Sequence, residues 1–169
     1  MKLLHIAAVV AAFALAGCAG DPPVDADASG GAGAGMESGS SAGMPAPHTV
    51  EYFKQVVGDR VFFGTDIHTL DSAAQSTLRA QAEWLQSNPG TEVVIEGHAD
   101  ERGTRQYNLA LGARRANSAR EYLIGQGISP SRVKATTYGK ERPVALCSDE
   151  SCWSQNRRAV TVVAGAPTS

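Results

Sequence analysis

A predicted strand, a polar turn and a long predicted helix follow one another between residues 93 and 123, and this order constrains the fold more than any other feature. The apolar run Val93-Val94-Ile95 is typical of a buried strand. Residues 98–103 form the polar turn, and a helical pattern with few breakers starts at Thr104, a possible N-cap. A strand that passes into a helix in this way is typical of a mixed α/β fold.

The long helix carries two polar residues on a stripe that is otherwise apolar. The residues at steps of three and four are Asn108, Leu111, Arg115, Ala119 and Leu123. A buried guanidinium must be paired, so Arg115 requires an anionic partner. Asp100 in the preceding turn is one candidate for that partner, and a ligand could supply another.

Short apolar runs alternate with helical patterns along residues 49–163. Strands are predicted at 61–63, 91–97, 133–138 and 159–163, and helices between 71 and 88, from 104 to about 125 and at 148–156. Residues 50–57 could form a helical turn or a short strand, and the pattern does not decide. The alternation predicts an α+β fold, a two-layer α/β sandwich of about four strands with helices packed on one face. The tail 164–169 is expected to fray.

Residues 1–17 are typical of a signal peptide, with Lys2 before an apolar run too short to span a membrane stably. The run ends in Leu15-Ala16-Gly17-Cys18, which resembles the bacterial lipobox. That resemblance implies cleavage before Cys18 and lipidation of this cysteine, whereas the alternative is an ordinary signal peptide. The absence of an aspartate after Cys18 favours sorting to the outer membrane.

Residues 18–48 lack the large apolar side chains that a core needs, so they are predicted to form a disordered, flexible linker. A flexible coil of this length spans roughly 30 Å on average. This suits a tether, and equally a linker of no special length. The folded domain is expected at residues 49–169.

Four motifs together resemble the OmpA-like peptidoglycan-binding domain, in its peptidoglycan-associated lipoprotein branch. They are Glu96–Thr104, Asn108-x-x-Leu111-x-x-x-Arg115-Ala116, Tyr138–Pro143 and Asn156–Val160. The resemblance implies a protein of the outer membrane's periplasmic face that binds the diaminopimelate residue of peptidoglycan stem peptides. It also implies TolB and other Tol proteins as partners in cell division and envelope integrity, with no cofactor.

Diaminopimelate ends in an ammonium and a carboxylate on one carbon, and the two groups need an anion and a planar cation. Asp100 can accept from the ammonium, and Arg115 can clamp the carboxylate through two parallel hydrogen bonds. Asn108 offers a donor and an acceptor to peptide groups. The alternative for Asp100 and Arg115 is an internal salt bridge that fixes the turn onto the helix.

Three further residues are assigned to the site. Leu111 can line it, although an apolar residue on this stripe is more often core. The resemblance matches Asp66, although Gly64 stands where this branch often has an acidic residue. It also suggests that Arg158 builds the pocket wall, whereas residues 156–158 could instead be a solvated basic cluster.

The sequence also offers residues for functions other than wall binding. His98, Asp100 and Glu101 could serve a metal-dependent peptidoglycan hydrolase, but metal sites usually need three or four convergent ligands. His98 is more simply expected to shape the loop through hydrogen bonds. A wall anchor for another machine, such as a flagellar stator, would have a transmembrane helix where this chain has a lipobox. A net charge of only −2 argues against nucleic-acid binding.

Cys147 and Cys152 are the two thiols left if Cys18 is lipidated, and export places them in an oxidising compartment. A local disulfide between them is therefore predicted. The pair is not general to the resembled branch, so its expected role is to stabilise the loop.

Overall fold

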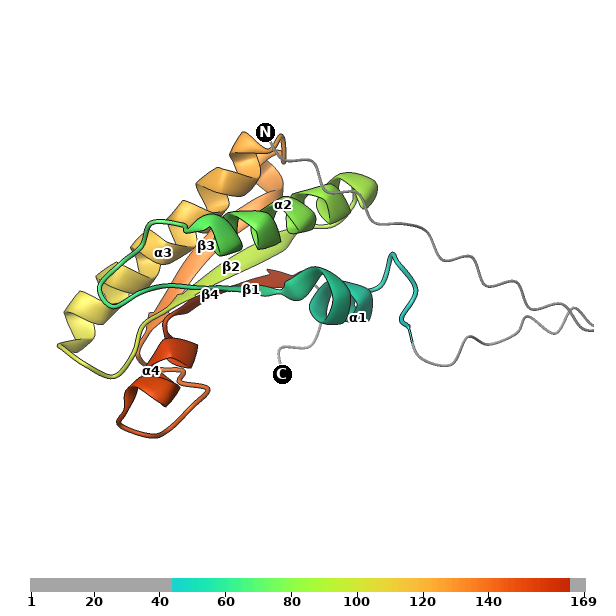
Figure 1. Ribbon diagram of the computed structural model, residues 1–169. Helices are drawn as coiled ribbons and strands as arrows, with labels where there is room; N and C mark the ends of the chain where they lie inside the picture. Colours follow the sequence, from blue (N-terminus) through green and yellow to red (C-terminus); the bar gives the residue numbers. More distant parts are fainter. Residues whose placement is uncertain (1–43, 165–169) are drawn as a thin grey trace, which may run out of the picture. The chain divides into compact units, whose positions relative to one another are not determined.

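The computed structural model describes residues 44–164, in which a four-stranded sheet is covered by two long helices on one face (Figure 1). The elements are α1 (Val50–Tyr52), the π-helix η1 (Phe53–Gly58), β1 (Arg60–Phe62), α2 (Ser72–Ser87), β2 (Val93–His98), α3 (Arg105–Gly125), the 3₁₀ helix η2 (Pro130–Arg132), β3 (Val133–Gly139), α4 (Glu150–Asn156) and β4 (Arg158–Val163). The predicted signal peptide 1–17, Cys18 and the linker as far as residue 43 lie outside the described residues.

The strands lie in the order β1-β4-β2-β3. β2 and β3 are parallel and are joined through α3, whereas β4 runs antiparallel to both of its neighbours, β1 and β2. The last strand therefore inserts between the first two, which brings residues 157–158 beside the end of β1. This is the α+β, two-layer sandwich with helices on one face that the sequence predicted.

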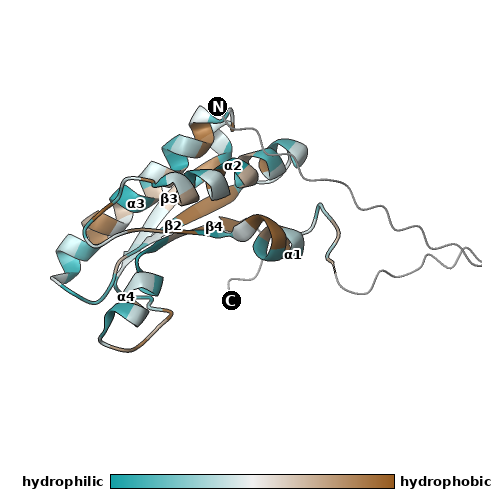
Figure 2. Cartoon of the chain, in the orientation of Figure 1, coloured by the Kyte–Doolittle hydropathy of each residue, from teal (hydrophilic) through white to brown (hydrophobic). Residues whose placement is uncertain are grey.

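The core lies between the sheet and the two long helices. The predicted stripe of α2 is buried there through Ala74, Leu78, Ala82 and Leu85, against strand residues such as Val93 and Ile95. Hydrophobic colour follows β2 and alternates with hydrophilic colour along α2 and α3 (Figure 2), as expected for helices with one buried face. Asp71 caps α2 as predicted, because its carboxylate accepts a hydrogen bond from the Ala74 amide at 2.8 Å.

Helix α3 approaches β2 closely because two glycines face each other. A Cβ atom on Gly97 would lie 1.8 Å from the carbonyl oxygen of Gly112, and one on Gly112 would lie 2.8 Å from the carbonyl oxygen of Gly97. Any side chain at Gly97 would therefore push the helix away from the sheet. The contact sets α3 against the end of β2, and so fixes Asn108 and Arg115 beside the 98–103 turn.

Residues 50–57, which the sequence left undecided, are helical. Thr49 caps α1 through a hydrogen bond from the Tyr52 amide, and α1 continues directly into η1. Phe53 of η1 is completely buried and packs against Trp84 of α2, with ring centroids 4.8 Å apart. This burial favours a helix over a strand here. No helix within residues 44–164 combines the length and the apolar character needed to cross a membrane.

The structure joins Cys147 and Cys152 in a disulfide, with their Cα atoms 5.5 Å apart. Changing both cysteines to serine is expected to lower stability by about 2 kcal/mol, because a small ring no longer restricts the unfolded chain. For a domain of this size, that corresponds to a fall of about 5–10 °C in melting temperature. Thermal unfolding with and without reductant measures it. Reductant should lower the melting temperature of the wild type and leave the double variant unchanged; equal effects on both would contradict the prediction.

Candidate functional site

A pocket of about 300 Å³ opens where β1 and β2 end and α3 begins. Its lining residues are Thr65, Asp66, Asp100, Arg102, Gly103, Tyr107, Asn108 and Leu111. Four of the predicted site residues therefore meet in one place: Asp66, Asp100, Asn108 and Leu111. They come from the loop after β1, the turn after β2 and the first turns of α3, segments that the sheet order brings together.

Asp100 is the buried anion of this pocket, with 8% of its surface exposed. Its Oδ1 accepts from the backbone amide of Arg102 at 3.1 Å, and its Oδ2 accepts from the Arg102 guanidinium at 2.7 Å and from Arg157 at 3.3 Å. Burial alone would raise the pKa of Asp100, but the hydrogen bonds and positive charge of Arg102, with the bond from Arg157, hold that pKa below its usual value. The carboxylate is therefore charged at neutral pH.

Arg115 is not among the residues that line the pocket, and its predicted clamp on a ligand carboxylate stays a prediction. The side chain is completely buried and donates to three backbone carbonyls: Ile67 at 2.8 Å, His98 at 2.9 Å and Gly64 at 3.0 Å. The predicted alternative, a salt bridge with Asp100, is not formed. Burial lowers the pKa of Arg115 to about 10, which still leaves it charged at neutral pH. Arg115 instead ties the loop after β1 to the end of β2.

The cation that does face the pocket is Arg102, which the sequence reasoning did not assign. Its guanidinium pairs with Asp100 and lies 4.2 Å from the ring centroid of Trp153 in α4. Its side chain is 39% exposed, so it can leave the carboxylate without unfolding its surroundings. The spacing Asp100-x-Arg102 within a tight turn could have indicated Arg102 as a pocket residue, because this spacing lets the guanidinium reach the carboxylate.

Of the two arginines in the last motif, Arg157 contacts Asp100, whereas Arg158 does not line this pocket. Arg157 donates to Asp100, to the Phe63 carbonyl at 3.0 Å and to Glu150 of α4. Arg158 begins β4, and neighbouring residues of an extended chain point to opposite sides of the sheet. It therefore faces away from Asp100.

Two residues of the pocket rim are joined across the opening. The Tyr107 hydroxyl donates to the Asp66 carboxylate, and this hydrogen bond raises the pKa of Tyr107. Asp66 has a backbone φ of 58°, a left-handed conformation that aspartate tolerates better than most residues. Asn108 donates from its amide to the Arg102 carbonyl at 2.7 Å, so it fixes the turn that holds Asp100.

The prediction that His98 shapes the turn through side-chain hydrogen bonds is wrong. Within the described residues neither ring nitrogen has a hydrogen-bond partner, and the ring stacks on Tyr138 with centroids 5.6 Å apart. Nor do His98, Asp100 and Glu101 converge. Within residues 44–164 the one group of three possible metal ligands is Cys147, Asp149 and Cys152, and the disulfide occupies both sulfurs.

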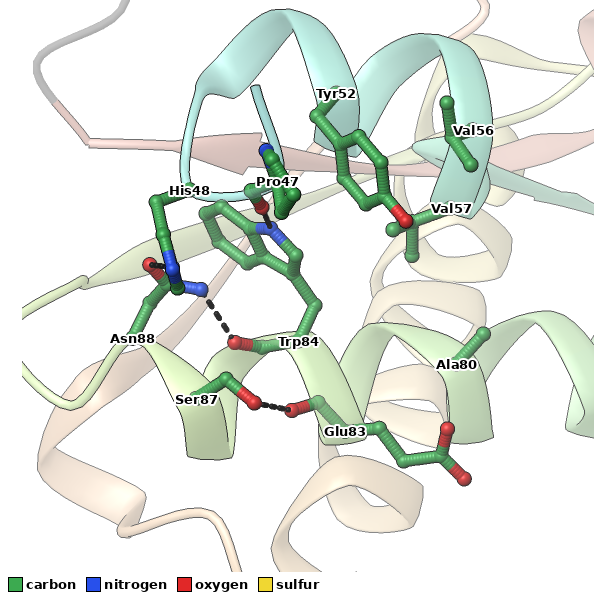
Figure 3. Close-up of a pocket in the computed structure, with 10 residues that line it drawn as sticks. All are labelled: Pro47, His48, Tyr52, Val56, Val57, Ala80, Glu83, Trp84, Ser87 and Asn88. Carbon is green, nitrogen blue, oxygen red and sulfur yellow. Dashed lines mark hydrogen bonds between the residues drawn. The ribbon is translucent and has the colours of Figure 1, made fainter. Parts of the chain in front are cut away.

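A second cavity, of about 400 Å³, lies between the α1–η1 segment and α2 and contains none of the predicted site residues (Figure 3). Trp84 forms its wall, and the indole N–H donates to the Pro47 carbonyl at 2.8 Å. His48 lies 3.2 Å from the side-chain oxygen of Asn88. These contacts fasten the segment before α1 onto the end of α2. The pocket around Asp100 is the candidate functional site because four predicted site residues line it.

Comparison with known proteins shows which family the chain resembles. A model of the OmpA family matches residues 62–158. The peptidoglycan-associated lipoprotein of Rhizobium meliloti (strain 1021) is 52% identical over 159 residues, which span 94% of this chain and 86% of that protein. The peptidoglycan-associated lipoprotein of Pseudomonas aeruginosa is 43% identical over 135 residues, which span 80% and 75%.

Two solved structures are informative in different ways. The crystal structure of the peptidoglycan-associated lipoprotein from Burkholderia pseudomallei has a TM-score of 0.65 and 38% identity, covering 70% of this chain and 99% of that one. The C-terminal domain of Helicobacter pylori MotB has a TM-score of 0.59 but only 18% identity, covering 64% and 85%. The second likeness shows a shared fold alone and lends no support to a stator role.

Proposed function

The chain belongs to the OmpA family as one of its peptidoglycan-associated lipoproteins, and from this membership we propose that it binds peptidoglycan non-covalently and anchors the outer membrane to it. It acts as a binding protein, with no catalytic step and no cofactor. The observation that carries the proposal is the charged Asp100 carboxylate, buried at a pocket and paired with a cation that can be displaced.

The ligand is the side-chain end of diaminopimelate, where an ammonium and a carboxylate share one carbon. The ammonium replaces the Arg102 guanidinium at Asp100, so the buried carboxylate keeps a cationic partner throughout. The displaced guanidinium remains close to Trp153 and pairs with the ligand carboxylate, for which its planar fork is suited. Arg102 thus takes the role that the sequence assigned to Arg115.

The other residues of the pocket shape this exchange. Asp66 and Tyr107 close one side of the opening, and Leu111 presents an apolar surface to the ligand's carbon chain. Asn108 and Arg115 support the site from behind by holding the backbone carbonyls of the surrounding loops. The surroundings of the Asp100 carboxylate are therefore rigid, whereas the Arg102 side chain beside it can move.

Anchoring further requires the predicted lipid on Cys18, which places the domain on the periplasmic face of the outer membrane. One pocket that relies on a partly exposed ion pair binds weakly. Many copies on one membrane that faces a polymeric wall bind firmly together through multivalency. TolB and the other Tol proteins complete the proposal as partners, because the resemblance to the peptidoglycan-associated lipoproteins implies them.

Changing Asp100 to asparagine is expected to weaken wall binding by more than about tenfold, because the amide keeps the shape but loses the charge that the ligand ammonium requires. Co-sedimentation of the soluble domain with isolated sacculi measures this. Free diaminopimelate should release the wild type from the sacculi, and lysine, which lacks the second carboxylate, should release less.

The matched control is Asp71→Asn, which lies outside the pocket and keeps its capping function because asparagine caps helices about as well as aspartate. It should sediment like the wild type. If Asp100→Asn also sediments like the wild type, the pocket is not the wall-binding site.

A further inference from the structure

A separate cavity lies on the face of the sheet opposite α2 and α3, and is here called the rear cavity. Its volume is about 120 Å³, and its lining residues are Lys54, Asp59, Arg60, Glu96, His98, Val144, Arg158, Val160, Thr161 and Val162. Glu96 and His98 alternate with Gly97 on β2, and Gly97 faces α3, so these two side chains point to the other side. The rear cavity shares no residue with the pocket around Asp100.

Two buried side chains in the rear cavity have polar atoms without hydrogen-bond partners. His98 is 2% exposed and Arg158 is 4% exposed. Within the described residues, both ring nitrogens of His98 and the Nε of Arg158 are the buried side-chain atoms that have no partner. A buried polar atom left unpaired costs about 1–3 kcal/mol. Three such atoms from two facing side chains therefore favour a ligand that can pair with them.

Arg158 forms no salt bridge within the described residues. The guanidinium contacts only two backbone carbonyls, Arg142 at 3.1 Å and Asn156 at 3.4 Å, and within residues 44–164 no carboxylate lies within salt-bridge distance of it. A buried cation is costly unless an opposite charge and further hydrogen bonds compensate it. Burial and repulsion from Arg60 lower the pKa of Arg158 to about 10, and the more distant carboxylates of Glu96 and Asp59 offset this only in part.

The rear cavity is lined by three cations, Lys54, Arg60 and Arg158, and by two carboxylates, Asp59 and Glu96, so its charge is positive by one. Lys54 is exposed near its rim, and Asp59 is already paired with Arg60 at 2.7 Å. The remaining carboxylate, Glu96, lies 3.8 Å from His98 Nε2. Burial, and after it the charges of Arg158 and Arg142, lower the pKa of His98 to about 3. The ring is thus neutral and can donate one N–H to an incoming anion.

We propose that the rear cavity is a binding site for a carboxylate group, held between the Arg158 guanidinium and the N–H of His98, with Lys54 at the rim. The volume is that of roughly four water molecules, which admits a carboxylate with a short carbon stem and excludes a sugar or a nucleotide. Val144, Val160 and Val162 supply an apolar wall for that stem. The carboxylate belongs to the end of a peptide chain or to an acidic side chain.

Acetate is the probe, because it carries the carboxylate group that a peptide end and an acidic side chain share. Chloride at matched ionic strength is the control anion. Titration with acetate should give a saturable shift of the His98 ring and Arg158 Nε–H signals in NMR spectra, and chloride should not.

Lys54→Ala should weaken acetate binding several-fold, because it removes one rim charge from an exposed position without disturbing the fold. The matched control is Arg79→Ala, an exposed cation on α2, which should bind like the wild type. Absence of a saturable shift with acetate, or an equal shift with chloride, overturns the proposal.

Two capped amino acids then distinguish the sources. N-acetylalanine carries a chain-terminal carboxylate, and the α-amide of N-acetylglutamate carries only a side-chain carboxylate. Tighter binding of the first indicates a peptide end as the natural ligand, and tighter binding of the second indicates an acidic side chain. If neither capped amino acid shifts the two signals, the cavity does not admit a carboxylate on a peptide and the proposal fails. Arg158→Met should abolish binding of all three probes in a protein whose spectrum remains folded.

Discussion

Replacing Arg115 with methionine is expected to destabilise the domain by about 3–5 kcal/mol, a large share of the stability of a domain this size. Methionine keeps much of the volume but leaves the carbonyls of Gly64, Ile67 and His98 without their donor. Each buried carbonyl without a partner costs about 1–3 kcal/mol. Unfolding by urea, followed by circular dichroism, measures the change in free energy.

Lysine at position 115 should restore only part of this loss, because an ammonium is a point donor and cannot reach three carbonyls in the plane of a guanidinium. Arg114→Met is the matched control, since Arg114 is the exposed neighbour on the same helix and its loss should change stability by less than about 0.5 kcal/mol. If Arg115 acted only as a clamp on a ligand, the Arg115→Met variant would lose binding and keep its stability. That result would show that the three carbonyl contacts do not hold the loops.

Acidification is expected to destabilise the domain through His98. The native ring, with a pKa of about 3, does not take up a proton that the unfolded chain accepts near pH 6.5. Stability from this group is therefore complete above pH 6.5 and falls as the pH drops toward 3, by about 2–3 kcal/mol at pH 4.5 and about 5 kcal/mol in full. The free energy of urea unfolding between pH 7.5 and 4.5 measures the slope.

His98→Phe should remove most of this slope, because phenylalanine cannot titrate and can stack on Tyr138 in the same place. The charged groups that face the ring are Arg158, Arg142 and Glu96, and all remain in the variant. His68→Gln is the control for a histidine outside the rear cavity and should keep the wild-type slope. If His98→Phe and the wild type lose stability equally between pH 7.5 and 4.5, His98 is not the group responsible.

The elements of the fold could be predicted because each is encoded locally. The stripe of α2 and the Asp71 cap are spacings within one segment, and the predicted strands differ from the observed ones by one or two residues at their ends. The structure of residues 50–57 could not be decided, because the burial of Phe53 against Trp84 is a contact between segments about 30 residues apart.

The site was predicted in position but not in detail. Asp100 and Asn108 were found because a buried stripe and a polar turn meet in sequence. The partner of Arg115 could not be read from the helix, since its acceptors lie in a loop whose path depends on the left-handed conformation of Asp66. The choice between Arg157 and Arg158 depends on which residue begins β4, and a difference of one residue sends the side chain to the other face of the sheet.

Strand β1 lies between the segment that precedes it and the pocket, and this position determines how the domain would bear a pulling force. The chain enters β1 at Arg60, after the segment fastened by Trp84, and leaves it toward Thr65 and Asp66 at the pocket (Figure 1). A pull between a membrane on one side and a bound polymer on the other would run along this strand. Its hydrogen bonds to β4 would then be strained together, in shear, and not opened one after another.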